Sequence, residues 1–442
     1  MSASPPRSNA TPSENPEDPE PEPRGAVSTA PADPLEGKRL FTPPFLRLLA
    51  MQAAYGFSFS MFFLLPKYLA SVGEPAARIG FVMAGFGVAC ILTIPFLRGI
   101  VETLGRRGTL IAANLLLASA AALFGLFDRP GLLAIPLRAS EGITWTLMFS
   151  TAIALTAEFA PPDRLAQAIG LAGGASLIMN ALAPAIGEPL ADHFGYRAVF
   201  FVAAVAAVAA AGLARRLPIS PAPRTVAAKP GPHVPPAVEG AGATRRGQLA
   251  VYAAFGAAGL AFSSLFAFLA PFALDHGVHA VRAFFIGYTS SAITIRVCGG
   301  RLSDRLGHRV VATSSLLLYG AVVASAGVLA PFHLGLLGLA FGTAHGAAYP
   351  ALMALLVQGT PLGKRPRALG VANGAMSLGI SAVAPAGVVA TRLGYPALFA
   401  LVGGLTSAAA LLLVPRERLE RLSLAASRRF RCFASLWGGL AR

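Results

Sequence analysis

The sequence is poor in charged residues, in cysteine and in tryptophan. Only 13% of its 442 residues are charged and 55% are hydrophobic, whereas a soluble domain carries about 25% charged residues. This composition excludes an ordinary water-soluble protein and indicates that lipid surrounds most of the chain. The three cysteines, Cys90, Cys298 and Cys432, are too few and too far apart to indicate a disulfide framework or a metal cluster.

The chain also lacks the common motifs of catalysis. No phosphate-binding loop, nucleotide-hydrolysis motif, catalytic triad or metal-ligand spacing occurs in it. We therefore predict that the protein is not an enzyme, that ATP does not drive it and that it needs no cofactor. No known nucleic-acid-binding module accompanies the net charge of +16, so we expect no nucleic-acid partner.

The positive charge is distributed unevenly around the apolar segments. Of the 36 Lys and Arg residues, 28 fall in the tails and in the loops on one side of the predicted membrane, and six fall on the other side. The remaining two, Arg138 and Arg296, lie within apolar segments. Because cytoplasmic loops carry the excess of Lys and Arg, we predict that both termini are cytoplasmic.

Apolar segments of membrane-spanning length repeat along most of the chain. About 20 apolar residues in a helix cross the hydrocarbon core of a bilayer, and nothing here alternates with the period of two that is typical of membrane strands. The predicted spans are 45–66, 76–97, 109–127, 132–157, 166–187, 198–214, 249–271, 283–300, 310–330, 332–357, 368–390 and 396–414. The predicted fold class is therefore an all-α integral membrane protein with twelve transmembrane helices.

Proline-rich and basic stretches divide the chain into domains. Residues 1–44 hold eleven prolines and seven acidic residues, a composition that cannot bury enough apolar surface to fold. Residues 218–247 hold seven prolines and separate the spans six and six. We expect a disordered cytoplasmic tail at 1–44, helical halves at 45–217 and 248–415, a flexible cytoplasmic linker at 218–247 and a basic cytoplasmic tail at 416–442.

The two halves repeat one another in sequence. The string AQAIGLAGGAS at 166–176 matches PRALGVANGAM at 366–376, with Ala and Gly recurring 200 residues apart. The string GYRAVF at 195–200 likewise matches GYPALF at 394–399. Two parallel halves related by an axis along the membrane normal are one of the repeat arrangements of secondary transporters.

The loop after the eighth predicted span carries the most specific motif of the chain. It contains the pattern G-x-L-x-D-R-x-G-x-R, formed by Gly300, Leu302, Asp304, Arg305, Gly307 and Arg309. This pattern resembles the loop signature of the major facilitator superfamily of secondary transporters. The resemblance implies a bundle of two pseudo-symmetric six-helix halves that works by alternating access, with this loop as a gating latch.

The equivalent loop of the first half departs from that signature. Arg98 replaces the leading Gly, Glu102 replaces the Asp and Thr103 replaces the Arg, whereas Gly105 and Arg106 are retained. We expect Glu102 to do the work of the Asp with a longer side chain, at less than the full strength of the motif.

Ionisable side chains interrupt two of the apolar spans. The string RASEGITW at 138–145 resembles the R-x-x-Q-G motif of drug/proton antiporters of the superfamily, with Glu141 in place of Gln. Arg138 and Glu141 share a helix face and can pair. We assign them to proton coupling, with a purely structural ion pair as the alternative. His345 has the repeat position of Glu141, and it is either a further proton carrier or a packed side chain.

Prolines and small residues mark the fifth predicted span. The string NALAPAIGEP at 180–189 looks like a degenerate form of the G-x-x-x-G-P-x-x-G-G motif found mainly in exporters, with Glu188 in place of the last Gly. Pro184 and Gly187 are retained, and Pro385 repeats the proline in the eleventh span. We expect Pro184, Gly187 and Pro385 to allow helix bending and close packing between the halves.

Polar side chains that face the predicted central cavity are few. The candidates are Gln52, Tyr55, Trp145, Asn180, Tyr288 and Asn373. Because they bring little fixed charge, the cavity suits an amphipathic or hydrophobic solute better than a sugar.

These features together predict a monomeric secondary transporter of a bacterial-type inner membrane. Its expected partners are the lipid bilayer, a small-molecule substrate and protons, with the proton gradient as the energy source. Proton-coupled export of a small, largely hydrophobic molecule is the preferred hypothesis. Proton-linked uptake of a sugar or a small organic acid is one alternative, and a non-transporting membrane sensor or scaffold on the same fold is another.

Overall fold

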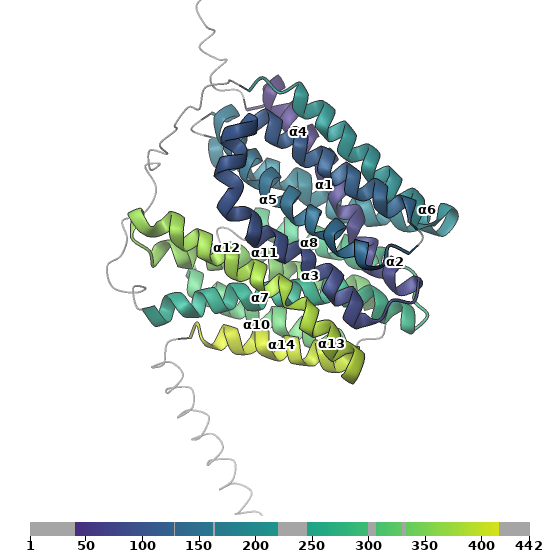
Figure 1. The fold of residues 1–442 in the computed structure, drawn as a ribbon. Coiled ribbons are helices and arrows are strands. Elements are labelled where there is room, and N and C mark those ends of the chain that lie inside the picture. Colours follow the sequence, from purple (N-terminus) through teal and green to yellow (C-terminus); the bar gives the residue numbers. More distant parts are fainter. Residues whose placement is uncertain are drawn as a thin grey trace, which may run out of the picture. The chain divides into compact units, whose positions relative to one another are not determined.

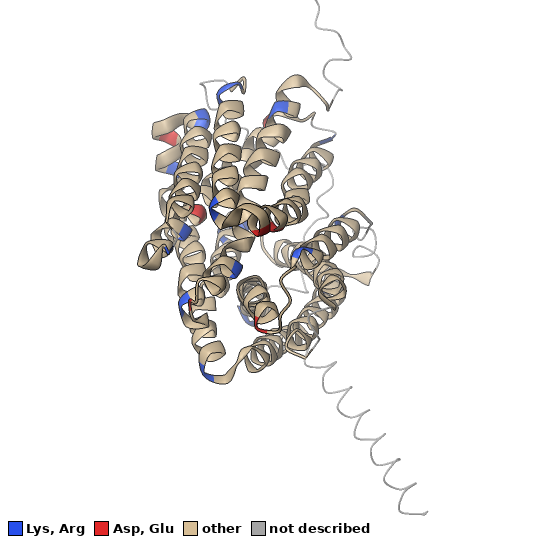
Figure 2. Cartoon of the chain, turned by 90° about the vertical axis from the view of Figure 1, so that its right-hand side faces the viewer, with Lys and Arg blue, Asp and Glu red and all other residues tan. Residues whose placement is uncertain are grey.

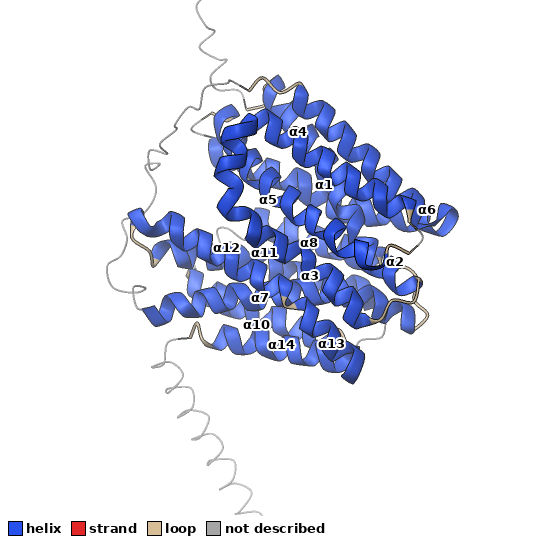
Figure 3. Cartoon of the chain, viewed as in Figure 1, coloured by secondary structure: helices blue, strands red, loops and turns tan. Residues whose placement is uncertain are grey.

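The chain is helical through almost all of the residues that the structure describes (Figure 3). The structure is a computed structural model, and it describes residues 40–127, 129–161, 164–219, 245–298, 306–328 and 333–414. No strand occurs within these ranges, and charged residues are sparse along the helices (Figure 2). The described helices belong to one compact unit that begins at Leu40. The predicted all-α fold is therefore confirmed.

Within each half, most helices follow one another with short connections (Figure 1). The first half contains α1 (Pro43–Met61), α2 (Leu65–Ser71), α3 (Ala76–Thr93), α4 (Leu97–Leu126), α5 (Ala134–Phe159) and α6 (Leu165–Arg215). The second half contains α7 (Arg245–Asp275), α8 (Arg282–Cys298), α10 (His308–Ser325), α11 (Leu334–Gln358), α12 (Arg365–Ser381), α13 (Val383–Leu393) and α14 (Tyr395–Leu411). Most predicted spans coincide with one helix or with part of one, apart from span residues that lie outside the described ranges. The predicted span 45–66 runs from α1 through a 3-10 turn at Phe62–Leu64 into α2, and the span 368–390 is divided between α12 and α13.

Six helical stretches are long and apolar enough, by length and composition, to cross a membrane. They are Pro43–Ser71, Ala76–Leu126, Gln167–Arg215, Arg245–Asp275, Leu334–Gln358 and Leu362–Leu411. Three of them are 49 to 51 residues long, which at 1.5 Å per residue is about 75 Å and more than twice a bilayer core. Each of these three therefore contains two of the predicted spans, and α5, α8 and α10 hold the rest of the twelve.

Four glycines turn the chain between successive spans. Gly105 has φ 66° and ψ 163°, and Gly195 has φ 78° and ψ 166°. In the second half, Gly307 has φ 86° and ψ 134°, and Gly394 has φ 84° and ψ 164°. The backbone of a residue other than glycine is strained at these values of φ and ψ. The turns fall at equivalent positions of the two halves, so the internal repeat seen in the sequence is also a repeat of backbone conformation.

The interface between the halves is closed at one end of the helix bundle. We call the end at which α1 begins and α14 ends the termini end, and the opposite end the far end. At the far end α3 packs directly on α13: a Cβ atom on Gly80 would lie 2.6 Å from the carbonyl oxygen of Val383, and one on Gly387 would lie 2.5 Å from that of Ala76. The two halves are therefore in backbone contact there.

The same interface is open at the termini end. Among the described residues, no atom lies within 4 Å of the position that a Cβ would take on Gly170 and Gly174 of α6 or on Gly370 and Gly374 of α12. Gly170 lies eighteen residues before Glu188, which is five full turns at 3.6 residues per turn. Gly170 is therefore on the same face of α6 as Glu188, and this is the face that contacts the second half at Glu188. The structure thus has one closed and one open end.

Several predicted domains lie largely outside the described residues. Of the predicted tail at 1–44, only residues from 40 onward are described, and α1 begins within it at Pro43. The predicted linker at 218–247 is described at its two edges alone, and α7 already begins at Arg245. The basic tail at 416–442 is wholly outside.

Candidate functional site

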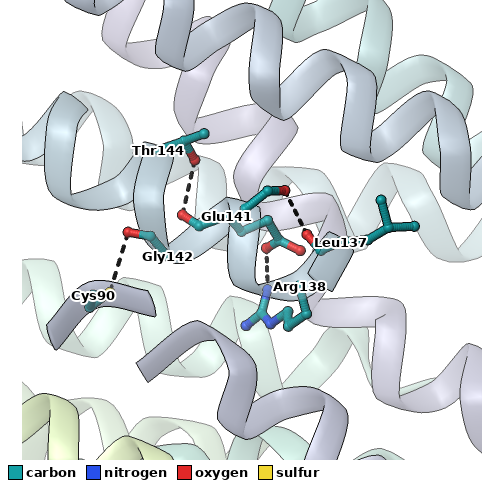
Figure 4. A network of polar contacts seen from close by, with 7 residues as sticks. Cys90, Leu137, Arg138, Glu141, Gly142 and Thr144 are labelled. Atoms are coloured by element: carbon teal, nitrogen blue, oxygen red, sulfur yellow. Dashed lines mark hydrogen bonds and ion pairs between the residues drawn. The ribbon is translucent and has the colours of Figure 1, made fainter. Parts of the chain in front are cut away.

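An ion pair is buried in the middle of the first half. Arg138 and Glu141 of α5 are 5% and 0% exposed, and a guanidinium nitrogen of Arg138 donates to a carboxylate oxygen of Glu141 (Figure 4). The guanidinium carbon of Arg138 lies 5.0 Å from the centre of the Phe86 ring on α3. An isolated charge is costly in such a place, and the pairing and the aromatic face both reduce that cost.

A close approach of α3 holds this pair in place. A Cβ atom on Gly142 would lie only 2.2 Å from the carbonyl oxygen of Phe86, so no other residue fits there without a shift of the backbone. The Cys90 thiol of α3 donates to the carbonyl oxygen of Gly142 at 3.4 Å (Figure 4). The glycine that follows Glu141 therefore lets α3 bring Phe86 against Arg138.

The polar groups of the pair are incompletely satisfied. Within the described residues, Oε1 of Glu141 and Nε of Arg138 have no hydrogen-bond partner. Elsewhere on α1, Nε2 of the buried Gln52 also has none among the described residues. The Tyr55 hydroxyl is close enough to Glu141 to feel its charge. An unpaired buried acceptor costs about 1–3 kcal/mol, so Glu141 is able to accept a proton or a hydrogen bond from a solute.

Aromatic rings lead from this pair toward the second half. The ring of Phe59 lies 5.9 Å from Tyr55, 5.1 Å from Trp145 and 6.0 Å from Phe63, between ring centres. Phe63 in turn lies 4.9 Å from Phe266 of α7. Tyr55 and Trp145, which the sequence predicts to face the cavity, thus belong to one aromatic surface next to Glu141.

The equivalent place in the second half is lined by aromatic rings. His345 of α11 is 8% exposed, and its Nδ1 lies 3.3 Å from the hydroxyl of Tyr319. Its ring centre is 5.2 Å from that of Phe262 and 5.9 Å from that of Tyr288. Unlike Glu141, His345 contacts aromatic rings and a hydroxyl group in place of an opposite charge.

The remaining cavity candidates are dispersed. Oδ1 of Asn180 accepts a hydrogen bond from the Ser60 hydroxyl at 2.7 Å, and its side chain adjoins Tyr288 of the other half. Asn373 is exposed on α12. Asn180 and Tyr288 therefore meet at the interface between the halves, whereas Asn373 lies on the open side of α12 beside Gly374, apart from them.

The motif loop of the second half is described only in part. Gly300, Asp304 and Arg305 lie outside the described residues. Gly307 forms the turn described above, and Nη1 of Arg309 donates to the carbonyl oxygen of Leu413 at 3.5 Å.

In the first half, Arg106 pairs with Glu158 at the end of α5. Glu102 pairs with Arg98 on its own helix at 2.7 Å, and both side chains are exposed. The hydrogen bond from Arg98 to Glu102 raises the pKa of the Arg98 guanidinium. No local sequence pattern indicates this partner of Arg106, because Glu158 is 52 residues away in the chain.

The backbone is interrupted near the predicted bend of the second half but not at that of the first. Helix α6 continues through Pro184 and is interrupted at Gly195. Gly187 is a packing site, since a Cβ there would lie 2.8 Å from Leu64 and 2.9 Å from Met61. In the second half, α12 and α13 are separated at Ala382, three residues before Pro385.

A second buried ion pair lies at the far end and was missed by sequence reasoning. Nζ of Lys67 on α2 lies 2.7 Å from Oε1 of Glu188 on α6, and the two side chains are 4% and 1% exposed. Glu188 also accepts hydrogen bonds from the backbone N–H groups of Val281 and Arg282, each at 2.8 Å. The available signal was the replacement of a motif glycine by a glutamate, with a lysine near the end of an apolar span.

Comparison with known proteins agrees with this architecture. The model of the Major Facilitator Superfamily matches residues 46–331 and 276–441. A comparison with curated proteins gave no match. Among solved structures, the nucleoside transporter NupG is similar at 14% identity and a TM-score of 0.65, over 84% of this chain and 98% of that one.

Two further structures share the fold. The human organic anion transporter MFSD10 (TETRAN) is similar at 18% identity and a TM-score of 0.58, over 84% of this chain and 100% of that one. A POT family transporter is similar at 12% identity and a TM-score of 0.67, over 84% and 95%. Identities this low report the fold and not the substrate. The family match over most of the chain, together with the membrane-spanning helices of two repeated halves, shows that this chain belongs to the Major Facilitator Superfamily.

Proposed function

We propose that this protein is a secondary active transporter that exports small amphipathic or hydrophobic molecules in exchange for protons. The observation that carries the proposal is the Arg138–Glu141 pair, buried in a membrane-spanning helix beside aromatic side chains. Ionisable groups in such helices mark ion and substrate pathways. The aromatic surface of Tyr55, Phe59 and Trp145 offers an apolar solute area for stacking, with Glu141 as the adjacent polar group.

The proposed coupling follows from competition for one carboxylate. While Glu141 is ionised, its oxygen Oε1, which has no partner among the described residues, accepts a hydrogen bond from the solute or pairs with a positive charge on it. When Glu141 takes up a proton, the carboxylate loses its charge and the solute is released, so that solute and proton occupy the site in turn. Alternation between the two ends of the interface then carries solute and proton in opposite directions.

The orientation of the cycle is part of the proposal. With both termini in the cytoplasm of a bacterial-type cell, as the distribution of Lys and Arg favours, the termini end faces inward. The conformation described above, closed at the far end and open at the termini end, is then the inward-facing state in which an exporter takes up its cargo.

Accumulation of lipophilic dyes in pump-deficient cells tests this function. Cells that make the wild-type protein are expected to hold less dye than empty cells, and a proton uncoupler or Glu141→Gln should abolish the difference. Glu74→Gln, which removes the carboxylate of a partly exposed pair with Arg78, is the matched control and should retain export. Uncoupler-sensitive accumulation above that of empty cells would reverse the direction to uptake, and full export by Glu141→Gln would refute the role of the pair.

A further inference from the structure

We infer that Glu188 is the latch that holds the far end of the transport pathway closed, by capping α8 of the opposite half. Glu188 belongs to α6 of the first half, whereas Val281 and Arg282 begin α8 of the second half. This inference rests on the transport activity of the family and is independent of the proposed substrate and of proton coupling.

The contact has the chemistry of a charged helix cap. Oε1 of Glu188 accepts the N–H of Val281 and Oε2 accepts the N–H of Arg282, both at 2.8 Å. The first N–H groups of a helix have no partner within the helix, and the helix dipole favours an anion at this end. One carboxylate therefore satisfies two donors of the opposite half, and separation of the halves breaks both hydrogen bonds at once.

Lys67 makes the latch reversible. It lies in the same half as Glu188 and contacts the same oxygen that accepts from Val281. When α8 moves away, the carboxylate keeps this partner and does not become an unpaired charge. Without Lys67 the closed state would bury an anion with no opposite charge beside it.

A weaker contact occupies the related place on the other side of the interface. There the N–H of Ala77, at the start of α3, donates to the hydroxyl of Thr391 on α13 at 2.9 Å, and this contact is exposed. The second half thus caps a helix of the first with a neutral hydroxyl, whereas the first half caps a helix of the second with a buried carboxylate. Because hydrogen bonds to charged, buried groups are the stronger ones, we assign the main latch to Glu188.

Distance measurement between spin labels across the far end tests the inference. His193 on α6 and His279 before α8 are both exposed, and each is replaced by a labelled cysteine in the full chain after Cys90, Cys298 and Cys432 are changed to serine. The wild-type background is expected to show mainly the short distance. Glu188→Gln should raise the ratio of long to short distances by at least about tenfold, which corresponds to about 1.4 kcal/mol.

A variant of the opposite half tests the same contact without touching the buried pair. Arg282→Pro removes one of the two N–H donors at the first position of α8, where proline is tolerated, and it should also raise the long-distance population. Arg282→Ala keeps the N–H and is its matched control, expected to match the wild type. Thr391→Val should change the ratio by less than about threefold, because it removes one neutral, exposed hydrogen bond.

The outcomes separate the latch from its alternatives. Unchanged distances in both Glu188→Gln and Arg282→Pro would overturn the inference, as would a larger effect of Thr391→Val. If Glu188→Gln does not fold, Arg282→Pro against Arg282→Ala decides alone. The labels report distances without any substrate, so a failure of dye export would leave this result standing.

Discussion

The two halves share a backbone design but place different chemistry at equivalent positions. In the first half, Glu141 and Arg138 form a buried ion pair, whereas in the second half His345 lies among Tyr319, Phe262 and other rings. The turns at Gly105 and Gly307 nevertheless have similar backbone angles. A duplicated fold can therefore keep its turns and its helix contacts while one copy specialises in charge and the other in aromatic packing.

Removal of one charge from the pair should have the largest effect. Arg138→Leu leaves the Glu141 carboxylate buried without its opposite charge, and loss of one partner of a buried pair costs about 3–5 kcal/mol. We expect a large fall in the apparent melting temperature in detergent. The double variant Arg138→Leu/Glu141→Leu should recover much of this loss, since no unpaired charge remains. A double variant as unstable as the single one would contradict the explanation by charge.

The second largest difference is expected when a methyl group is added at the glycine that follows Glu141 or His345. Gly142→Ala places a Cβ 2.2 Å from the carbonyl oxygen of Phe86, whereas Gly346→Ala places one 3.1 Å from the Cα of Ala292. Overpacking of this kind costs about 1–3 kcal/mol, and we expect the greater loss of stability, and loss of export, in Gly142→Ala. Equal melting temperatures for the two variants would show that the tighter approach at Gly142 is not needed.

Substitution of the turn glycines should lower the stability of the protein by similar amounts in the two halves. Gly105→Ala and Gly307→Ala each force a Cβ into a region of φ and ψ that costs about 1–3 kcal/mol. Among the described residues, no atom lies within 4 Å of the added Cβ at either position. The strain is therefore expected in the backbone, and the two losses of melting temperature should be similar. Gly99→Ala, inside α4 and equally free of neighbours, is the control and should be neutral or slightly stabilising.

The smallest effect is expected in the aromatic site. Tyr319→Phe removes the hydroxyl that lies 3.3 Å from Nδ1 of His345 and keeps the ring, so the cost of one neutral hydrogen bond, about 0.5–1.5 kcal/mol, is the expected change in stability. Dye export should remain if Glu141 carries the proton. A loss of export without a loss of folded protein would instead give His345 a part in proton transfer.

Much of the architecture was predictable because it depends on local features of the chain. The twelve spans follow from apolar segments whose length matches the bilayer, and the Gly-Tyr string that recurs at Gly195 and Gly394 indicates the repeat of the two halves. The pairing of Arg138 with Glu141 is also local, since residues three apart lie on one face of a helix.

The far end shows what a local pattern does not contain. Glu188 could be read only as a departure from a motif, because its partners Lys67 and Val281 lie 121 and 93 residues away in the chain. Likewise, local sequence did not predict the partner of Arg106 or the aromatic rings around His345.

The sequence by itself determined that lipid surrounds most of this protein, where its membrane spans lie and that its two halves repeat, since hydropathy and repeated strings are local features of the chain. The tertiary structure alone decided which buried charges meet across the interface and which end of it is closed. The free energy of a buried carboxylate depends on the groups that the fold brings to it, and these come from other helices.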